Sequence, residues 1–352
     1  MVRLSRKALS DLYEAPLPEL QAASSFVRQS LNGDRIWYNR NFHIEPSNIC
    51  AHRCRFCSYR RDDASQPGAW SMALDDILPY CEAKFEPGMT EIHIVGSVHP
   101  GQSFDYYRQI VAVAKGFART HETPEKPIAI KAYTAVEIDD MARYNGLSTE
   151  ACLQALREAG LDTMPGGGAE IFAPHIRRQI CPDKCTGERW LQIHRTAHRM
   201  GIPTNGTMLF GHLESREDRI DHLLALRELQ DETGGFNAFI PLKFRARDNA
   251  LAGLGEVSRE ETLRTFAIAR LALDNIPHIK AYWPMLGKDL ALEAMAWGAD
   301  DLDGTINDST RIYSLAGAEE QRPAFPVQEL RQRAEAAGWK AVERDSFYKI
   351  IS

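Results

Sequence analysis

Three closely spaced cysteines are the residues of this chain best suited to chemistry. Cys50, Cys54 and Cys57 form a C-x3-C-x2-C pattern within residues 48–59, and Phe56 stands just before the last of them. Three thiolates at this spacing can hold three irons of a [4Fe-4S] cluster and leave the fourth iron without a local protein ligand. Such an iron is free to bind a small molecule, so the pattern predicts a cluster that takes part in catalysis.

Two other interpretations of the three cysteines are a zinc site and a group of buried thiols. A structural zinc site usually shows a second ligand pair at matching spacing, and none follows convincingly downstream. Two of the remaining cysteines form a C-x3-C that could be half of a second cluster, and the other two lie on predicted helix faces as small apolar residues. These four are Cys181 and Cys185, then Cys81 and Cys152. The spacing favours one cluster, held by the first three cysteines.

The cysteine pattern resembles that of the radical S-adenosylmethionine (radical SAM) superfamily. In that superfamily the amino and carboxylate groups of SAM chelate the open iron, and reduction yields a 5′-deoxyadenosyl radical. The resemblance implies that Cys50, Cys54 and Cys57 are the cluster ligands. It places Phe56 near the adenine of SAM.

Composition narrows the class of protein further. The 352 residues are 44% apolar and carry a formal net charge of −6, with a sequence pI of about 6.0. This acidic balance argues against a nucleic-acid-binding protein. No apolar run approaches ~20 residues, so no membrane span is expected, and the N-terminus lacks the apolar stretch of a secretory signal. Seven cysteines in a chain of this length do not indicate a disulfide scaffold, and free thiolates for iron suit a reducing cytoplasm.

Alternating strand-like and helix-like segments must position the cysteine loop. Apolar spacing predicts one or two helices within residues 5–32. The expected strands are 42–49, 90–98, 127–135, 161–165, 203–211, 236–244, 278–286 and 301–306. The expected helices are 72–86, 103–119, 136–159 with a break near Asn145-Gly146, 174–200 with a break near Pro182, 216–232, 258–274 and 288–297. This order predicts an α/β fold, a (β/α)8 TIM-type barrel, although six closing strands instead of eight remain an alternative.

The same pattern divides the chain into a barrel and two extensions. Residues 1–40 are interpreted as an N-terminal helical extension, 41–310 as the radical SAM barrel, and 311–352 as a C-terminal helix and short strand packed on its outside. Residues at the carboxyl ends of barrel strands meet the substrate. The unusual residues of this chain concentrate at those ends.

The ends of the second and third predicted strands carry residues whose backbone or side chains could bind a ligand. Gly96 and Ser97 allow close backbone approach, which suits the amino group of SAM. His99 would point into the mouth of the barrel, or it could be a loop histidine bonded to backbone. Lys131 could hold a carboxylate, or it could form a buried pair with an acid such as Glu170 or Glu91.

The next strands add a glycine run and further polar groups. Gly166, Gly167 and Gly168 precede Glu170, and the carboxylate of Glu170 could bind the ammonium or ribose hydroxyls of SAM. Asn205 faces the same side of its strand as Thr207, as the period of two requires. Farther along the chain, polar and positively charged residues stand near the predicted barrel mouth: His212, Arg245 and Lys280. Such a cluster suggests an anionic substrate.

Several longer segments resemble the aminofutalosine synthase family of the futalosine route to menaquinone. They are 94–100, 131–138, 165–172 followed by 180–182, 230–236 and 298–305, and they span most of residues 40–310. The resemblance implies that SAM is a cosubstrate, whose 5′-deoxyadenosyl group adds to the enolpyruvyl double bond of 3-[(1-carboxyvinyl)oxy]benzoate. Loss of bicarbonate then gives aminodeoxyfutalosine. Ser97 departs from the second glycine that the family leads one to expect.

A dicarboxylate substrate needs charged or multiply hydrogen-bonded partners. Of the residues at the strand ends, we expect at least one of His99, Lys131, His212 and Arg245 to contact it. An electron donor such as flavodoxin or ferredoxin is the implied protein partner.

Three rival functions remain open on sequence alone. One is the dehypoxanthine futalosine cyclase of the same pathway, which shares the glycine segment, and another is a deazaflavin-type synthase subunit. The third, from a different class, is a non-catalytic iron–sulfur carrier. A carrier would not need a glycine run, polar strand ends and a full barrel.

Overall fold

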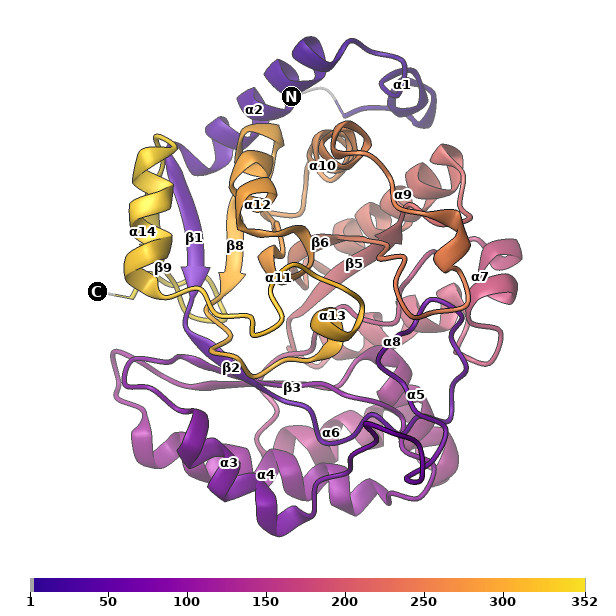
Figure 1. Ribbon diagram of the computed structural model, residues 1–352, viewed down its shortest axis with the longest axis vertical. Coiled ribbons are helices and arrows are strands. Elements are labelled where there is room, and N and C mark those ends of the chain that lie inside the picture. Colours follow the sequence, from indigo (N-terminus) through magenta and orange to yellow (C-terminus); the bar gives the residue numbers. More distant parts are fainter. Residues whose placement is uncertain (1–2, 352) are drawn as a thin grey trace.

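Parallel strands alternate with helices around a ring (Figure 1). The computed structural model describes residues 3–351. The strands are β1 (Arg35–Asn39), β2 (Asn41–Ile44), β3 (Glu91–Ile94), β4 (Ala129–Ala132), β5 (Thr204–Phe210), β6 (Phe236–Lys243), β7 (His278–Ile279), β8 (Asp301–Gly304) and β9 (Lys340–Glu343).

The helices cover the outside of this ring. In chain order they are α1 (Arg6–Asp11), α2 (Leu17–Asn32), η1 (Leu74–Asp76), α3 (Ile77–Lys84), α4 (Phe104–His121), α5 (Ala135–Tyr144), α6 (Thr149–Ala159), α7 (Pro174–Ile180), α8 (Gly187–Arg199), α9 (Arg216–Thr233), η2 (Ala252–Leu254), α10 (Arg259–Ala272), α11 (Trp283–Leu286), α12 (Lys288–Ala294), η3 (Met295–Trp297), α13 (Ile312–Leu315) and α14 (Val327–Ala336). The predicted helix breaks near Asn145-Gly146 and Pro182 both occur, between α5 and α6 and between α7 and α8.

Side-chain caps explain where many of these helices begin. The hydroxyl of a serine or threonine accepts an N–H of the first turn, which satisfies one of the donors that a helix start leaves free. The capping residues are Ser5, Ser103, Thr134, Ser148, Thr186, Ser215 and Ser258. Each cap fixes the point at which the chain leaves its loop for the outer layer.

The ring closes through eight strand positions. β2, β3 and β4 form one parallel sheet, and β5, β6 and β7 form another. Residues 163–164 bridge β4 on one side and β5 on the other, and Lys280 just after β7 bridges Asp301 of β8. β8 pairs with β1, whose chain continues through Arg40 into β2. The order is therefore β1/β2, β3, β4, 163–164, β5, β6, β7, β8, which confirms the predicted barrel and its closure.

The expected strand 161–165 is reduced to the bridge residues 163 and 164, and two further segments differ from the sequence-based expectation. Residues 35–39 form β1, where only helices were predicted, because this short buried run has no polar alternation that would mark it as a strand. The predicted strand 278–286 is reduced to β7 and the bridge residue Lys280, and the chain then forms α11. Pro284 sits in the first turn of α11, where its fixed φ and missing N–H favour a helix start.

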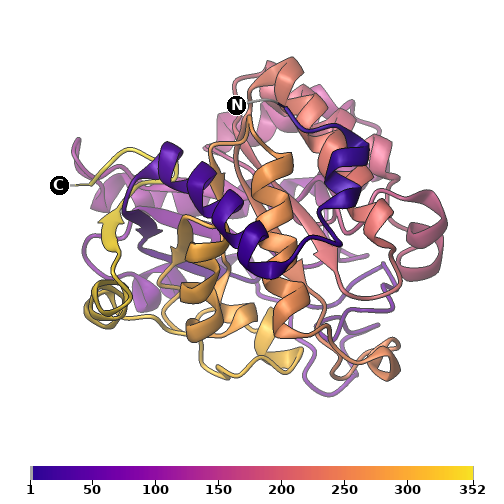
Figure 2. The ribbon, with the colours of Figure 1, turned by 90° about the horizontal axis from the view of Figure 1, so that it is seen from above.

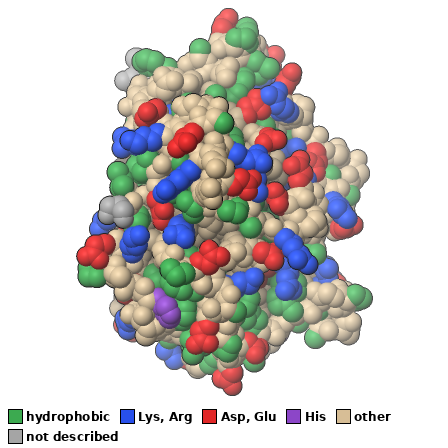
Figure 3. All heavy atoms as spheres, turned by 60° about the vertical axis from the view of Figure 1, so that its left-hand side comes forward, with side chains coloured by type: hydrophobic (Ala, Val, Ile, Leu, Met, Phe, Trp, Pro, Cys, Tyr) green, Lys and Arg blue, Asp and Glu red, His purple; other side chains and the backbone are tan. Residues whose placement is uncertain are grey.

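Both terminal segments pack on the barrel. In Figure 2, α2 lies across α10, and α1 lies beside α9. At the other end, β9 adds to the edge of β1 in parallel. No helix in the described part of the chain is long and apolar enough to cross a membrane. On the face shown in Figure 3, acidic and basic side chains are intermixed and form no large patch of one charge.

The lower interior of the barrel is held by buried ion pairs. Lys131 lies 2.5 Å from Glu91, and Lys280 lies 2.6 Å from Asp303. The C-terminal segment reaches the same level, where Ser346 donates a hydrogen bond to Glu91. Burying charges is unfavourable unless each has a partner, and here each has one. These compensated pairs form a polar base beneath the cavities described next.

Candidate active site

The cysteine loop is fixed by a network around Asn48. The Asn48 side chain donates to the carbonyls of Tyr59 and Gly68 and accepts from the N–H of Trp70. Its backbone carbonyl accepts from Arg61 at 2.7 Å. Since these bonds span both ends of residues 48–59, they fix the shape of the loop.

Cys50, Cys54 and Cys57 line one cavity of about 620 Å³, here called the cluster cavity. All three are free thiols, Cys54 is buried, and burial raises the pKa of the Cys54 thiol. A buried thiolate needs a metal or another positive group to be stable. Three thiols that line one cavity are the donor set that the predicted [4Fe-4S] cluster needs, and the cavity has space for a small molecule beside it.

The remaining walls of the cluster cavity come from the ends of neighbouring strands. They include Phe56, Gly96, Ser97, Thr134, Glu137, Gly168 and Lys184. A Cβ on Gly96 would lie 3.1 Å from the carbonyl oxygen of Ser47, so only glycine fits there easily. The Ser97 hydroxyl lies 2.9 Å from the carbonyl of Ser47 and 2.7 Å from that of Ile49. Ser97 therefore ties the loop after β3 to the cysteine loop, which gives the serine a role that glycine lacks.

Glu137 is a cavity residue that the sequence analysis did not single out. Its carboxylate caps α5 by accepting from the Thr134 N–H at 2.7 Å and the Thr134 hydroxyl at 2.8 Å. Burial raises the pKa of Glu137 to about 7. The available signal was the capping box Thr134-x-x-Glu137 directly after a strand, which places a carboxylate at a barrel mouth.

Lys184 is the second residue that sequence reasoning missed. Its ammonium lies 2.7 Å from the Glu170 carboxylate and 5.4 Å from the centroid of the Phe56 ring. Glu170 itself is buried and has a φ of +47°, a conformation that side chains rarely adopt and that often marks functional sites. In the sequence, Lys184 is one of the three residues between Cys181 and Cys185, and nothing local marks it as a site residue.

A second cavity, of about 540 Å³, lies inside the barrel and is here called the barrel cavity. Its walls are mainly apolar and aromatic, with a few polar groups. They include Val95, Gly166, Gly167, Ile240, Leu242, Tyr282, Ile312 and Tyr313, with His43, His93, Thr134, Thr207 and Asp303 as polar members. Thr134 lines both cavities, so the two meet at the end of β4.

The glycine run separates these two cavities. Gly168 lines the cluster cavity, whereas Gly166 and Gly167 line the barrel cavity. A Cβ on Gly166 would lie 2.6 Å from the carbonyl oxygen of Asn205, a contact with backbone that cannot give way. The run thus lets the loop after residue 164 pack directly on β5 while both cavities stay open.

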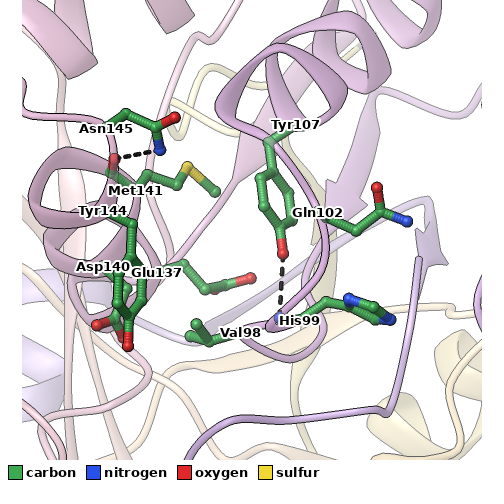
Figure 4. Close-up of a pocket in the computed structure, with 9 residues that line it drawn as sticks. All are labelled: Val98, His99, Gln102, Tyr107, Glu137, Asp140, Met141, Tyr144 and Asn145. Carbon is green, nitrogen blue, oxygen red and sulfur yellow. Dashed lines mark hydrogen bonds between the residues drawn. The ribbon is translucent and has the colours of Figure 1, made fainter. Parts of the chain in front are cut away.

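His99 lies in a third, smaller space of about 300 Å³, a side chamber (Figure 4). Its backbone N–H donates to the Tyr107 hydroxyl, and its Nδ1 accepts from the N–H of Gly101. Val98 and Glu137 line both the side chamber and the cluster cavity. His99 is therefore a loop histidine bonded to backbone, which was one of the two alternatives predicted for it. It lies behind the wall of the cluster cavity.

The other predicted site residues are already engaged within the protein. Lys131 is paired with Glu91, one of the two acids considered for it. His212 lies 3.0 Å from Glu214, and its ring nitrogens contact nearby backbone. Arg245 lies 3.3 Å from Glu256 and donates to the carbonyl of Gly317. None of these three residues, nor Asn205 within β5, is among the residues that line the two central cavities.

Comparison with known proteins defines the class. The model of the radical SAM superfamily matches residues 44–226, and that of the CofH/MqnC C-terminal region matches residues 233–352. Methylornithine synthase has a related solved structure, with a TM-score of 0.75 at 17% identity, covering 97% of this chain and 94% of that one. This chain belongs to the radical SAM superfamily, in the group that carries the CofH/MqnC C-terminal region.

Two curated relatives are more specific. The aminodeoxyfutalosine synthase of Thermus thermophilus is 42% identical over 95% of this chain and 88% of its own length. The cyclic dehypoxanthine futalosine synthase of Streptomyces coelicolor is 36% identical over 94% of this chain and 82% of its own. The relatedness extends over nearly the whole chain in both cases, and the synthase is the more similar of these two.

Proposed function

We propose that this protein is an aminodeoxyfutalosine synthase, which joins the 5′-deoxyadenosyl group of SAM to 3-[(1-carboxyvinyl)oxy]benzoate and releases bicarbonate. The observation that carries the proposal is 42% identity to a synthase over 95% of the chain. The two joined cavities support it, since a reaction of this kind needs SAM and an aromatic substrate to meet.

Each cavity has a role in this proposal. Cys50, Cys54 and Cys57 would hold the cluster, which when bound would supply the electron that cleaves SAM. Gly96 and Ser97 offer backbone groups for the amino end of SAM, and Phe56 offers a face for the adenine. Lys184, which lines the cluster cavity and is held by Glu170, would orient the polar groups of SAM.

The barrel cavity would hold the benzoate substrate. Its apolar wall keeps water and stray hydrogen donors away from a carbon radical. Thr134 stands where the cavities meet, so the enolpyruvyl double bond would lie beside it. The protein thereby binds and orients both reactants while the cluster and SAM supply the hard chemistry. We further propose flavodoxin or ferredoxin as the electron donor.

Substrate selection tests the proposal against its nearest rival. The anaerobically reconstituted protein is given SAM, dithionite and either the enolpyruvyl benzoate or dehypoxanthine futalosine, and substrate loss is followed by mass spectrometry. The synthase consumes the benzoate and leaves the nucleoside untouched. Consumption of the nucleoside alone would assign the chain to the cyclase, and absence of SAM cleavage with a full cluster would favour a carrier.

A further inference from the structure

Two histidines at one level of the barrel are not explained by the fold. His43 of β2 and His93 of β3 are paired in register, and both line the barrel cavity. Their rings lie edge to face, with centroids 4.6 Å apart. Both ring nitrogens of His43 and the Nε2 of His93 have no hydrogen-bond partner among the described residues.

Unpartnered ring nitrogens at this depth are unfavourable for folding. A buried polar group without a hydrogen-bond partner loses its bonds to water and gains none in the protein. Other buried histidines of this protein are bonded: His52 contacts Asp140 at 2.5 Å, and His222 donates to the Thr207 carbonyl at 2.8 Å. His43 is only 2% exposed and has neither a carboxylate nor a carbonyl as a partner. A histidine at this position does not stabilise the fold through hydrogen bonds, and binding a ligand explains its presence better.

The charged residues around the pair are already matched. Glu91 and Lys131 neutralise one another, and so do Asp303 and Lys280. The histidines are thus not needed to balance charge at the base of the barrel. Burial lowers the pKa of His43 to about 4, so at neutral pH its imidazole is uncharged and carries one N–H donor.

The position of the pair determines which part of a ligand it meets. Lys131 is in register with His93, and Thr134, where the cavities join, lies three residues farther toward the mouth. The reacting double bond belongs at that junction. The aromatic ring then lies among Ile240, Leu242 and Tyr282, and its substituent reaches the level of the histidines.

We propose that His43 and His93 donate hydrogen bonds to the ring carboxylate of the benzoate substrate at the closed end of the barrel cavity. This inference rests on the proposed function and deepens it, because it names the residues that select an aromatic ring bearing a carboxylate. A hydrogen bond to a charged group contributes enough to change binding by roughly tenfold or more.

A pair of ligands isolates this contact. Binding of 3-[(1-carboxyvinyl)oxy]benzoate and of 2-phenoxyacrylate, which lacks only the ring carboxylate, is measured by calorimetry on the cluster-loaded protein. Wild type prefers the benzoate by about tenfold or more. In His43→Phe and His93→Phe this preference falls toward one. His43→Asn and His93→Asn, whose shorter side chains withdraw the donor but keep a polar group in the wall, lose most of it too.

His194 provides the matched control. It is also a fully buried histidine with an unpartnered ring nitrogen, but it stacks on Trp190 and lies outside both central cavities. His194→Asn keeps the wild-type preference. SAM cleavage without substrate and the melting temperature report folding of every variant, and if the Phe variants unfold, the Asn variants decide.

The outcomes separate the inference from the function it rests on. An unchanged preference in the folded His43 and His93 variants overturns the inference, and so does a wild-type preference near one; neither affects the proposed function if the benzoate is still adenosylated. If wild type neither binds nor adenosylates the benzoate, the proposed function fails and this assignment fails with it.

Discussion

At the scale of single residues, the candidate site depends on three cysteine thiols and on one buried lysine. The three cysteine thiols line one cavity, and Lys184 brings a positive charge to the same cavity, held by Glu170 at 2.7 Å. A [4Fe-4S] cluster ligated by three thiolates carries negative charge, which a nearby ammonium stabilises.

The first prediction concerns the cluster ligands. Cys57→Ala removes one of three thiolate ligands, so the variant loses most of its cluster iron and cleaves no SAM under dithionite. Cys185→Ala is the control, because Cys185 does not line the cluster cavity, and it keeps both iron and activity. Iron analysis and 5′-deoxyadenosine release measure the result. Full iron content in the Cys57 variant would contradict the assignment.

The second prediction concerns Glu170. Glu170→Gln removes the charge that holds Lys184, so the KM for SAM rises by roughly tenfold while the KM for the benzoate changes much less. Glu158→Gln, on the exposed side of α6, is the matched control. Steady-state kinetics with each substrate varied in turn provides the measurement. A larger effect on the benzoate would move Glu170 to the other substrate.

Residue-level prediction from sequence succeeded where chemistry is local. The cysteine spacing and the glycines beside Glu170 indicated a cavity that the fold then formed. Lys184 was missed because it stands between Cys181 and Cys185, whose spacing could indicate half of a second cluster. His43 and His93 were missed because strand positions become a site only when pairing brings two strands into register.

At the scale of elements, each functional group stands at a strand end whose conformation is fixed from outside. The non-glycine residues with positive φ include Tyr133 after β4, Glu170 after residues 163–164 and Asp303 in β8. A non-glycine residue in this backbone conformation destabilises the fold by about 1–3 kcal/mol, and it persists only where the surrounding structure fixes it. Helix packing supports the strand ends: the Tyr133 hydroxyl donates to the Tyr107 carbonyl of α4, and His222 of α9 donates to the Thr207 carbonyl of β5.

The third prediction concerns this contact between α9 and β5. Burial lowers the pKa of His222 to about 3, so below the ordinary histidine value of 6.5 the unfolded chain binds a proton that the folded protein does not. The stabilising contribution is complete above pH 6.5 and is lost as pH falls toward 3, by up to about 1.4 kcal/mol per pH unit.

Urea unfolding between pH 7 and pH 4 measures this slope. His222→Phe lowers stability at pH 7 but shows a smaller loss on acidification than wild type. The exposed His175→Phe serves as the control and keeps the wild-type slope. Equal slopes for wild type and the His222 variant would show that His222 is protonated in the folded protein.

At the scale of the whole molecule, the two ends of the chain complete the base of the barrel. β1, from the N-terminal side, pairs with β8 and β9, and Arg344 beyond β9 lies 2.6 Å from Asp301. The (β/α)8 order was predictable from alternating patterns. The pairing of β1 with β9 was not, because local patterns carry no information about partners some 300 residues apart.

The fourth prediction concerns the buried ion pairs of this base. Glu91→Gln leaves Lys131 charged and unpaired, and lowers the free energy of unfolding by about 3–5 kcal/mol. The double variant Glu91→Leu/Lys131→Met removes both charges and loses less than the single variant. Denaturant unfolding of both provides the comparison. A double variant less stable than the single one would show that the pair itself holds the base together.

The fate of the adenosyl group tests the central claim most directly. The reconstituted protein is incubated anaerobically with dithionite, 3-[(1-carboxyvinyl)oxy]benzoate and SAM labelled with ¹³C in the adenosyl ribose, and the products are read by mass spectrometry. The account predicts the label in an adenosylated product of the benzoate, with bicarbonate released in equal amount. Label found only in 5′-deoxyadenosine would contradict it, because SAM would then be a source of hydrogen abstraction and not a cosubstrate.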